Sequence, residues 1–156
     1  MINNIILYHL PIFSFTSYTS FYPLSIMDKK TRQKFIDKDF LYAIVGATQN
    51  KEKYGYQLLV DLKDKGYKVI AVNPKYNEVA GAPCYPDLIS LEERPDVVVL
   101  VVGEKNAEKV IKDCLDLELN RVWFQPGSEY DEAVKLAKSA RFEIMVGKCI
   151  MEETGG

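Results

Sequence analysis

The chain has 156 residues, of which 47% are hydrophobic and 27% are charged, and its formal net charge is -2 at pH 7. This length corresponds to one ordinary domain, and the composition is that of a globular protein that needs neither disulfides nor metals to fold. The small negative charge supplies no general field for nucleic acid, so no nucleic-acid partner is expected.

Cysteine and histidine usage argues against several further classes of site. The three cysteines, Cys84, Cys114 and Cys149, are odd in number and widely spaced. They indicate neither a disulfide framework nor a zinc site and favour a reducing, cytoplasmic location. The single histidine, His9, leaves the folded part without a Ser-His or Cys-His pair. The sequence therefore indicates no catalytic residue and no metal, and it favours a protein that is not an enzyme.

Residues 1–26 differ from the rest of the chain. All 20 Lys and Arg residues and all 22 Asp and Glu residues follow Met27. The segment has neither the basic start of a signal peptide nor the run of about twenty apolar residues of a membrane span. We interpret it as a poorly ordered extension from a mis-assigned start, with a weak membrane-binding or partner-binding leader as the alternative. Residues 27–156 are expected to form the folded domain, with no membrane partner.

A short charged helix is predicted from Lys29 to Asp37, and strands then alternate with helices. The strands are short, β-branched and almost continuously apolar, which is typical of strands buried on both faces of a parallel sheet. They are predicted at 41–46, 67–72, 96–102, 121–125 and 142–147. Apolar residues at helical spacing predict three helices with buried faces that contain Leu58, Leu59 and Leu62; Ala107, Val110, Ile111, Cys114 and Leu115; and Ala133, Val134, Ala137 and Ala140.

Local signals mark helix ends and one irregular stretch. Gly66 stands where the first of these three helices should end, and Ser128, three residues before Asp131, resembles an N-cap for the last one. Residues 73–95 are rich in proline, glycine and asparagine. They are predicted to form a shortened crossover with a short helix at Pro86 to Leu91.

The alternation predicts an α/β fold, a Rossmann-like doubly wound parallel sheet of five strands. The simplest strand order is 3-2-1-4-5, which puts a ligand crevice beyond the carboxyl ends of the first and fourth strands. Four segments are expected to converge there: 46–55, 73–75, Val102 with Gly103, and Gln125 with Pro126 and Gly127.

The residues after the first strand are typical of a phosphate-binding loop. Gly46, Ala47 and Thr48 end a buried strand with small side chains, and the next helix offers free N–H groups and the positive end of its dipole. A packing glycine at Gly46 and a helix cap at Thr48 are the structural alternatives. The pattern favours a ligand of the nucleotide type.

The end of the second strand indicates which nucleotide is bound. Asn73, Pro74 and Lys75 stand where a fold that binds NAD usually has an Asp or Glu for the ribose hydroxyls. A lysine there favours a phosphorylated ribose, and an ordinary solvated lysine is the alternative.

With these segments, the chain resembles the small single-domain CoA-binding proteins, whose fold is similar to the CoA-binding domain of the succinyl-CoA synthetase α-subunit. The resemblance runs from about Leu41 to Glu152 and includes Val45 to Thr48, Lys53 to Gly55, Val72 to Lys75, Gly81 with Cys84 to Pro86, Trp123 to Gly127, and Lys148 to Ile150. It implies coenzyme A as the cofactor. The pyrophosphate would lie at Gly46, Ala47 and Thr48 with Lys53, Tyr54 and Gly55 closing over it, and the ribose phosphate would face Asn73, Pro74 and Lys75.

Two departures limit what the resemblance implies. Many family members have a pair of prolines on the adenine side, where this chain has Val102 and Gly103, and a serine at the position of Thr48. The phosphorylated histidine of the synthetase has no counterpart, because His9 lies outside the matching residues. The resemblance therefore implies binding of CoA or acyl-CoA without ligase activity.

Cys149 follows the last predicted strand, where the pantetheine arm of CoA would arrive. A small buried residue and a thiol that forms a mixed disulfide with CoA both fit this position, whereas Cys114 and Trp123 are predicted to pack in the core.

The predicted function is a binding module for CoA or acyl-CoA that serves as a carrier, sensor or regulatory subunit. An NADP-dependent oxidoreductase and a dinucleotide-sensing protein are the alternatives. A homo-oligomer is compatible with the sequence, which offers no argument for one.

Overall fold

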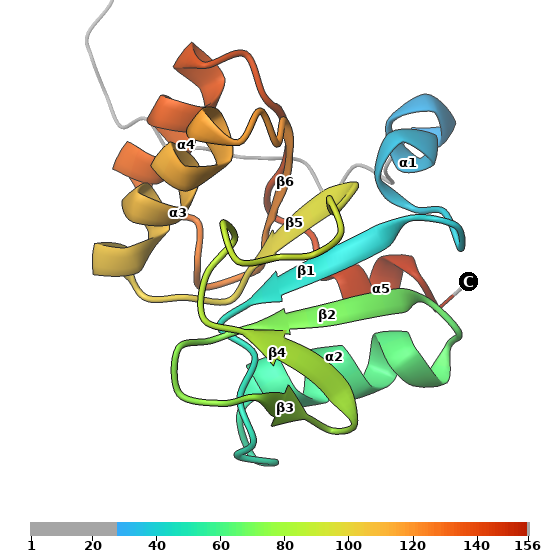
Figure 1. Cartoon of the computed structure of the whole chain (residues 1–156). Coiled ribbons are helices and arrows are strands. Elements are labelled where there is room, and N and C mark those ends of the chain that lie inside the picture. Colours follow the sequence, from blue (N-terminus) through green and yellow to red (C-terminus); the bar gives the residue numbers. More distant parts are fainter. Residues whose placement is uncertain (1–27, 156) are drawn as a thin grey trace, which may run out of the picture.

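A sheet with helices on both faces makes up the part of the chain that the computed structural model describes, residues 28–155 (Figure 1). The predicted extension, residues 1–26, lies outside this part. The strands are β1 (Leu41–Val45), β2 (Lys68–Val72), β3 (Glu78–Val79), β4 (Ala82–Tyr85), β5 (Val97–Leu100), β6 (Arg121–Phe124) and β7 (Glu143–Met145). The helices are α1 (Lys29–Phe35), α2 (Tyr54–Asp64), α3 (Glu104–Asp116), α4 (Asp131–Ser139) and α5 (Ile150–Glu153).

All five predicted strands are present as β1, β2, β5, β6 and β7, and neighbouring pairs among them are parallel. Every residue of β1 and β5 is buried, because helices cover both faces of the sheet at its centre. The continuous apolar character of these segments is thus explained by burial on two sides.

The predicted strand count and strand order are wrong. The sheet has seven strands in the order β3-β4-β2-β1-β5-β6-β7. Strand β4 pairs in parallel with β2 and occupies its outer edge, so β5 pairs with the free edge of β1 instead. When β4 is counted as the third parallel strand, the order becomes 3-2-1-4-5-6, a common order of doubly wound dinucleotide-binding folds.

A β-hairpin replaces the irregular crossover that was predicted between residues 73 and 95. Strands β3 and β4 are antiparallel, and Ala80 and Gly81 connect them, both with positive φ. Two such residues form the tight turn that suits the twist of a hairpin. The short helix predicted at Pro86 to Leu91 is absent from this described segment, where the Asp87 carboxylate instead accepts hydrogen bonds from Ser90 N and Oγ at 2.8 and 2.7 Å.

Several helix ends follow from local chemistry, and one prediction of a cap is wrong. The side chain of Asp28 caps α1 by accepting a hydrogen bond from Thr31 N at 3.0 Å, and Gly66 follows α2 with a φ of +80°, as predicted. The N-cap of α4 is Tyr130, without a side-chain hydrogen bond. Ser128 does not cap α4, because its hydroxyl accepts a hydrogen bond from Val102 N at 3.1 Å.

Two apolar cores lie on opposite faces of the sheet. Helices α1, α2 and α5 cover one face and α3 and α4 cover the other (Figure 1). Trp123 is fully buried in the first core and Cys114 in the second, so the prediction that both residues pack in the core is confirmed. Burial raises the pKa of the Cys114 thiol to about 12, and the thiol therefore stays neutral.

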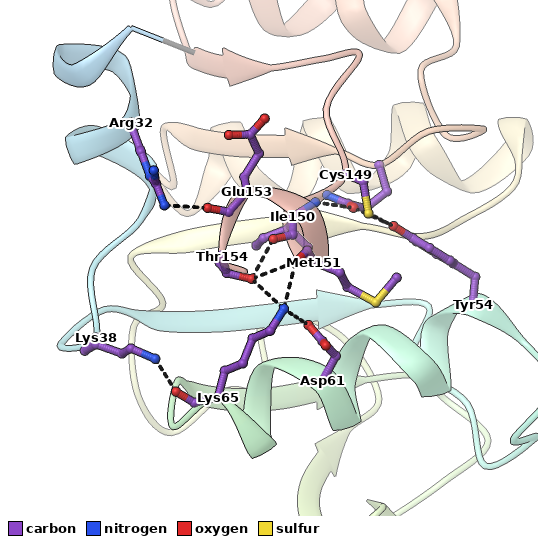
Figure 2. Close-up of polar contacts among 11 residues, drawn as sticks. Arg32, Lys38, Tyr54, Asp61, Lys65, Cys149, Ile150, Met151, Glu153 and Thr154 are labelled. Carbon is purple, nitrogen blue, oxygen red and sulfur yellow. Dashed lines mark hydrogen bonds and ion pairs between the residues drawn. The ribbon is translucent and has the colours of Figure 1, made fainter. Parts of the chain in front are cut away.

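The short helix α5, which was not predicted, is held between α1 and α2 by polar contacts (Figure 2). The ammonium of Lys65, next to the end of α2, donates to the Asp61 carboxylate and the Met151 carbonyl, both at 2.7 Å, and to Thr154 Oγ1 at 3.3 Å. On the other side, the Arg32 guanidinium donates to the Glu153 carbonyl at 2.7 Å.

Replacing Lys65 with methionine is expected to lower the free energy of unfolding by about 1–3 kcal/mol, because it leaves half-buried acceptors without their donor. The methionine retains an apolar stem of similar length, so packing is largely preserved. Urea unfolding followed by circular dichroism measures the loss. Lys112→Met, at an exposed position paired with Glu108 at 3.7 Å, is the control and should change stability by less than about 0.5 kcal/mol. Equal effects of the two substitutions would contradict this account.

Candidate functional site

A cavity of about 850 Å³ lies at the carboxyl ends of β1, β2 and β5. Its volume is in the range of small-molecule sites. The position is the point where the strand order reverses, between β1 and β5, where open α/β sheets bind their ligands. The predicted crevice between the first strand and the strand at 121–125 is corrected accordingly, because β5 separates β1 from β6.

Most of the predicted ligand-binding residues line this cavity. They come from the loop after β1, the start of α2, the end of β2 and the end of β5: Gly46, Thr48, Lys53, Tyr54, Gly55, Asn73, Pro74, Lys75 and Val102.

The remaining predicted residues lie outside the lining of the cavity. Ala47 belongs to the loop after β1 but is fully buried, and Gly103 is the N-cap of α3. Gln125, Pro126 and Gly127 follow β6, two strands away from β1. Cys149, the N-cap of α5, contacts a residue that lines the cavity.

The backbone comes unusually close to itself at Gly46. The residue has a φ of +97°, and a Cβ built there would lie 1.9 Å from the Val101 carbonyl oxygen. A Cβ on Gly55, in the first turn of α2, would lie 2.5 Å from the Gly46 carbonyl oxygen. Both glycines are required by packing, and this packing also keeps side chains out of the floor of the cavity.

The start of α2 presents a favourable environment for an anion. Lys53 is its N-cap and makes no side-chain capping hydrogen bond within the described residues. The first N–H groups of a helix have no partner inside it, and the dipole adds partial positive charge. Thr48 does not cap this helix, which begins at Tyr54. Its hydroxyl accepts a hydrogen bond from Asn50 N at 3.3 Å and lies 3.3 Å from the Tyr76 hydroxyl.

Asn73 joins the loops that follow β1 and β2. Its side-chain amide donates to the Ala47 carbonyl at 2.8 Å, and its Oδ1 accepts from Lys75 N at 3.0 Å. These bonds fix the backbone of Lys75 beside the glycine loop, while its side chain is exposed at the border of the cavity. Lys75, for which the sequence predicted a contact with a phosphorylated ribose, therefore lines the same cavity as the glycine loop.

Tyr54 connects the cavity to Gln125 and Cys149. Its hydroxyl donates to Gln125 Oε1 at 2.9 Å and lies 3.0 Å from Cys149 Sγ, a contact that Figure 2 shows. The same Gln125 oxygen accepts from Ile150 N at 3.1 Å. Burial keeps the pKa of Tyr54 well above its ordinary value, so the hydroxyl is neutral and can act as a donor.

Sequence reasoning missed one wall of the cavity. Residues of the β4–β5 connection and one face of α3 form it: Pro86, Asp87, Leu88, Asn106, Lys109, Val110 and Asp113. The α3 residues recur at helical spacing, which was a usable signal, but only the apolar positions of that helix were interpreted.

Within residues 28–155, His, Cys, Asp and Glu side chains form no group of three or more that could bind a metal ion. None of the described helices combines the length and the apolar character needed to cross a bilayer.

Two curated ligases with similar sequences are much longer than this chain. The ADP-forming acetate–CoA ligase of Methanocaldococcus jannaschii is 36% identical over 81 residues, which cover 52% of this chain and 12% of that protein. The match to ADP-forming acetate–CoA ligase I of Archaeoglobus fulgidus covers 10% of that protein. The chain thus spans about a tenth of the length of these relatives.

A solved structure and a family model match over most of the chain. A conserved hypothetical protein of Pyrococcus furiosus is 39% identical, with a TM-score of 0.70, and the match covers 73% of this chain and 98% of that one. The model of the CoA-binding domain matches residues 41–154. These residues include the loop after β1, the end of β2 and the start of α5, and the chain belongs to the family of CoA-binding domains.

Proposed function

We propose that this protein binds CoA or acyl-CoA in the cavity at the carboxyl ends of β1, β2 and β5. One observation carries the proposal: in a member of the CoA-binding domain family, a single cavity is bordered by the glycine loop, the start of α2 and Lys75. Backbone N–H groups suit the pyrophosphate of CoA, and an ammonium group suits its 3′-phosphate.

In this arrangement, the pyrophosphate lies against Gly46, Ala47 and Thr48, with Lys53, Tyr54 and Gly55 beside it. Asn73, Pro74 and Lys75 face the ribose and its 3′-phosphate. Val102 and Gly103 lie toward the adenine, and the pantetheine arm runs toward Tyr54, with Gln125, Pro126, Gly127 and Cys149 beyond.

We propose a role as a carrier, sensor or regulatory subunit in the cytoplasm. The three free cysteines within the described residues agree with a reducing compartment. The matched ligases are about ten times longer than the matching segment, so their reaction is not assigned to this chain. NADP is the competing ligand, because Lys75 suits a 2′-phosphate as well as a 3′-phosphate.

Isothermal titration of the full chain with CoA, acetyl-CoA, NADPH and NADH tests the proposal. We expect CoA and acetyl-CoA to bind with micromolar dissociation constants and both nicotinamide cofactors to bind at least about tenfold more weakly, because only CoA and NADPH carry a ribose phosphate and only CoA carries it at the 3′ position. Binding of NADPH without binding of CoA would favour the oxidoreductase or dinucleotide sensor instead.

A further inference from the structure

A cluster of three polar side chains adjoins the cavity. It consists of Tyr54 at the start of α2, Gln125 after β6 and Cys149 before α5. The Tyr54 hydroxyl lies 2.9 Å from Gln125 Oε1 and 3.0 Å from Cys149 Sγ, and Figure 2 shows its contact with the thiol. Tyr54 also lines the cavity, so the cluster is continuous with the cavity through this residue.

The side-chain amide of Gln125 lacks a partner. Gln125 is fully buried, and its Nε2 has no hydrogen-bond acceptor among residues 28–155. The carboxamide cannot be turned over, because its oxygen accepts from Ile150 N at 3.1 Å and the amide nitrogen could not accept this bond. Buried donors without a partner are unfavourable and rare in native proteins. The unpaired amide therefore points to an acceptor that comes from a ligand.

Cys149 supplies a nucleophile in the same cluster. Its side chain is partly exposed, whereas Cys84 and Cys114 are buried. The Tyr54 hydroxyl has one proton, which it can donate either to Gln125 Oε1 or to the Cys149 sulfur. A thiolate, the nucleophilic form of cysteine, would therefore have a hydrogen-bond donor beside it.

The reactive end of acyl-CoA matches these groups. In the proposed arrangement the pantetheine arm runs toward Tyr54, so its thioester comes to the cluster. A thioester offers an oxygen for the Gln125 amide and an electrophilic carbon for the Cys149 sulfur. Free CoA ends in a thiol, which is only a weak acceptor. The unpaired amide therefore favours a ligand with an acyl group.

We propose that Cys149 takes over the acyl group of bound acyl-CoA and that the Gln125 amide donates a hydrogen bond to the acyl oxygen. The Cys149 sulfur bonds to the acyl carbon, the bond from that carbon to the CoA sulfur breaks, and the proton of the Cys149 thiol ends on the CoA thiol. One thioester replaces another, so no oxidant or further reactant is needed.

Gln125 is fully buried, so the Tyr54 side chain has to turn away before a ligand oxygen reaches the amide. Tyr54 is half-buried beside the cavity and is the residue that joins the two. The inference rests on the proposed function and gives a chemical means by which a carrier holds its acyl group.

Mass spectrometry of the full chain incubated with saturating acetyl-CoA tests this inference. A phosphine reductant excludes disulfides without competing as a thiol. We expect one acetyl group per chain, located at Cys149 by peptide mapping, absent from Cys149→Ser and removed by hydroxylamine, which cleaves thioesters. Acetylation of Cys149 should be at least about tenfold faster in the folded chain than in the chain unfolded in urea, because binding positions the thioester beside the thiol.

Gln125→Glu tests the role of the amide, because it retains an oxygen for Tyr54 and Ile150 but replaces the amide donor. It should slow acetylation of Cys149 by at least about tenfold, the lower range for losing a donor to a developing oxyanion. Alkylation of Cys149 by iodoacetamide develops no such charge and should change by less than about threefold. The ratio of the two rates separates a contact with the acyl oxygen from a change in the exposure of the thiol.

Gln57→Glu is the matched control, because Gln57 is exposed on α2 and absent from the cavity lining, and it should retain the wild-type ratio. Circular dichroism shows whether the variants fold, and Gln125→Met, which brings no charge into the core, replaces Gln125→Glu if that variant unfolds. If acetyl-CoA binds but Cys149 is acetylated no faster than in the unfolded chain, or if the Gln125 variant slows both reactions equally, the inference is overturned while the proposed function stands. If neither CoA nor acetyl-CoA binds in the titration, the proposed function fails.

Discussion

Replacing Gly46 with alanine is expected to destabilise the fold by about 3–5 kcal/mol and to eliminate binding in the cavity. Gly46 has a φ of +97°, a backbone conformation that is energetically unfavourable for alanine. In addition, the new methyl group would lie 1.9 Å from the Val101 carbonyl oxygen. That carbonyl cannot easily move, because Val101 N donates to the Val45 carbonyl at 2.8 Å and Gly46 N donates to the Val72 carbonyl at 3.0 Å. Relief of the clash would separate β1 from a neighbouring strand.

Urea unfolding of the alanine variant measures the loss, and titration with CoA measures binding in whatever fraction folds. Gly127→Ala is the matched control, because Gly127 also has a positive φ, +87°, but its added methyl group would have no atom within 4 Å. Gly127→Ala should lower the free energy of unfolding by only about 1 kcal/mol, because it introduces the unfavourable backbone conformation without a steric clash. If the two alanine variants were equally stable, the close approach at Gly46 would not be the cause of its requirement for glycine.

Replacing Lys75 with alanine is expected to weaken CoA binding about tenfold and to change binding of dephospho-CoA by less than about twofold. The two ligands differ only in the 3′-phosphate, so their affinity ratio isolates the contact that we assign to this ammonium group. The exposure of Lys75 limits the effect, since solvent screens the interaction.

Lys68→Ala is the control for the general loss of one positive charge. Lys68 is exposed at the opposite end of β2, so it shares the strand but not the cavity. Both variants are titrated with CoA and with dephospho-CoA at two salt concentrations. In Lys68→Ala, which retains Lys75, binding of CoA should depend more strongly on salt than binding of dephospho-CoA, whereas in Lys75→Ala the two ligands should show the same salt dependence. A parallel loss for both ligands in Lys75→Ala would mean that the residue contacts the pyrophosphate or merely holds the loop.

The individual strands could be predicted from the sequence because each one is a continuous apolar run, but their order could not. That order depends on β4, which pairs with β3 through Ala82 and Pro83 and with β2 through Cys84 and Tyr85. Each pairing is only two residues long and the strand contains a proline, so neither length nor alternation reveals it. The hairpin turn at Ala80 and Gly81 also lacks the Asn-Gly or Asp-Gly pair that usually signals such a turn.

The candidate site was predictable where one contiguous segment forms it. The glycine loop and the end of β2 each follow a buried strand, and their residues meet at the cavity as the parallel arrangement requires. The helical spacing of Asp113 with the other α3 residues was a usable signal for one part of the second wall, but the position of Asp87 was not predictable, because it depends on how the β4–β5 connection passes α3. The error in strand order also explains why Gln125 was expected in the crevice. Gln125 lies outside the lining of the cavity and accepts a hydrogen bond from the hydroxyl of Tyr54, which does line it.

The arrangement of α5 means that the last helix of the described chain is a structural part of the domain and not a tail. Its first residues support Tyr54 through Gln125 and Cys149, and Thr154 at its end is buried and bonded to Lys65. A truncation before Ile150 would remove one wall of the core together with the support behind the cavity. A shortened version of the protein intended for ligand studies should therefore retain everything up to Thr154, and a fusion partner is better attached through a spacer beyond it.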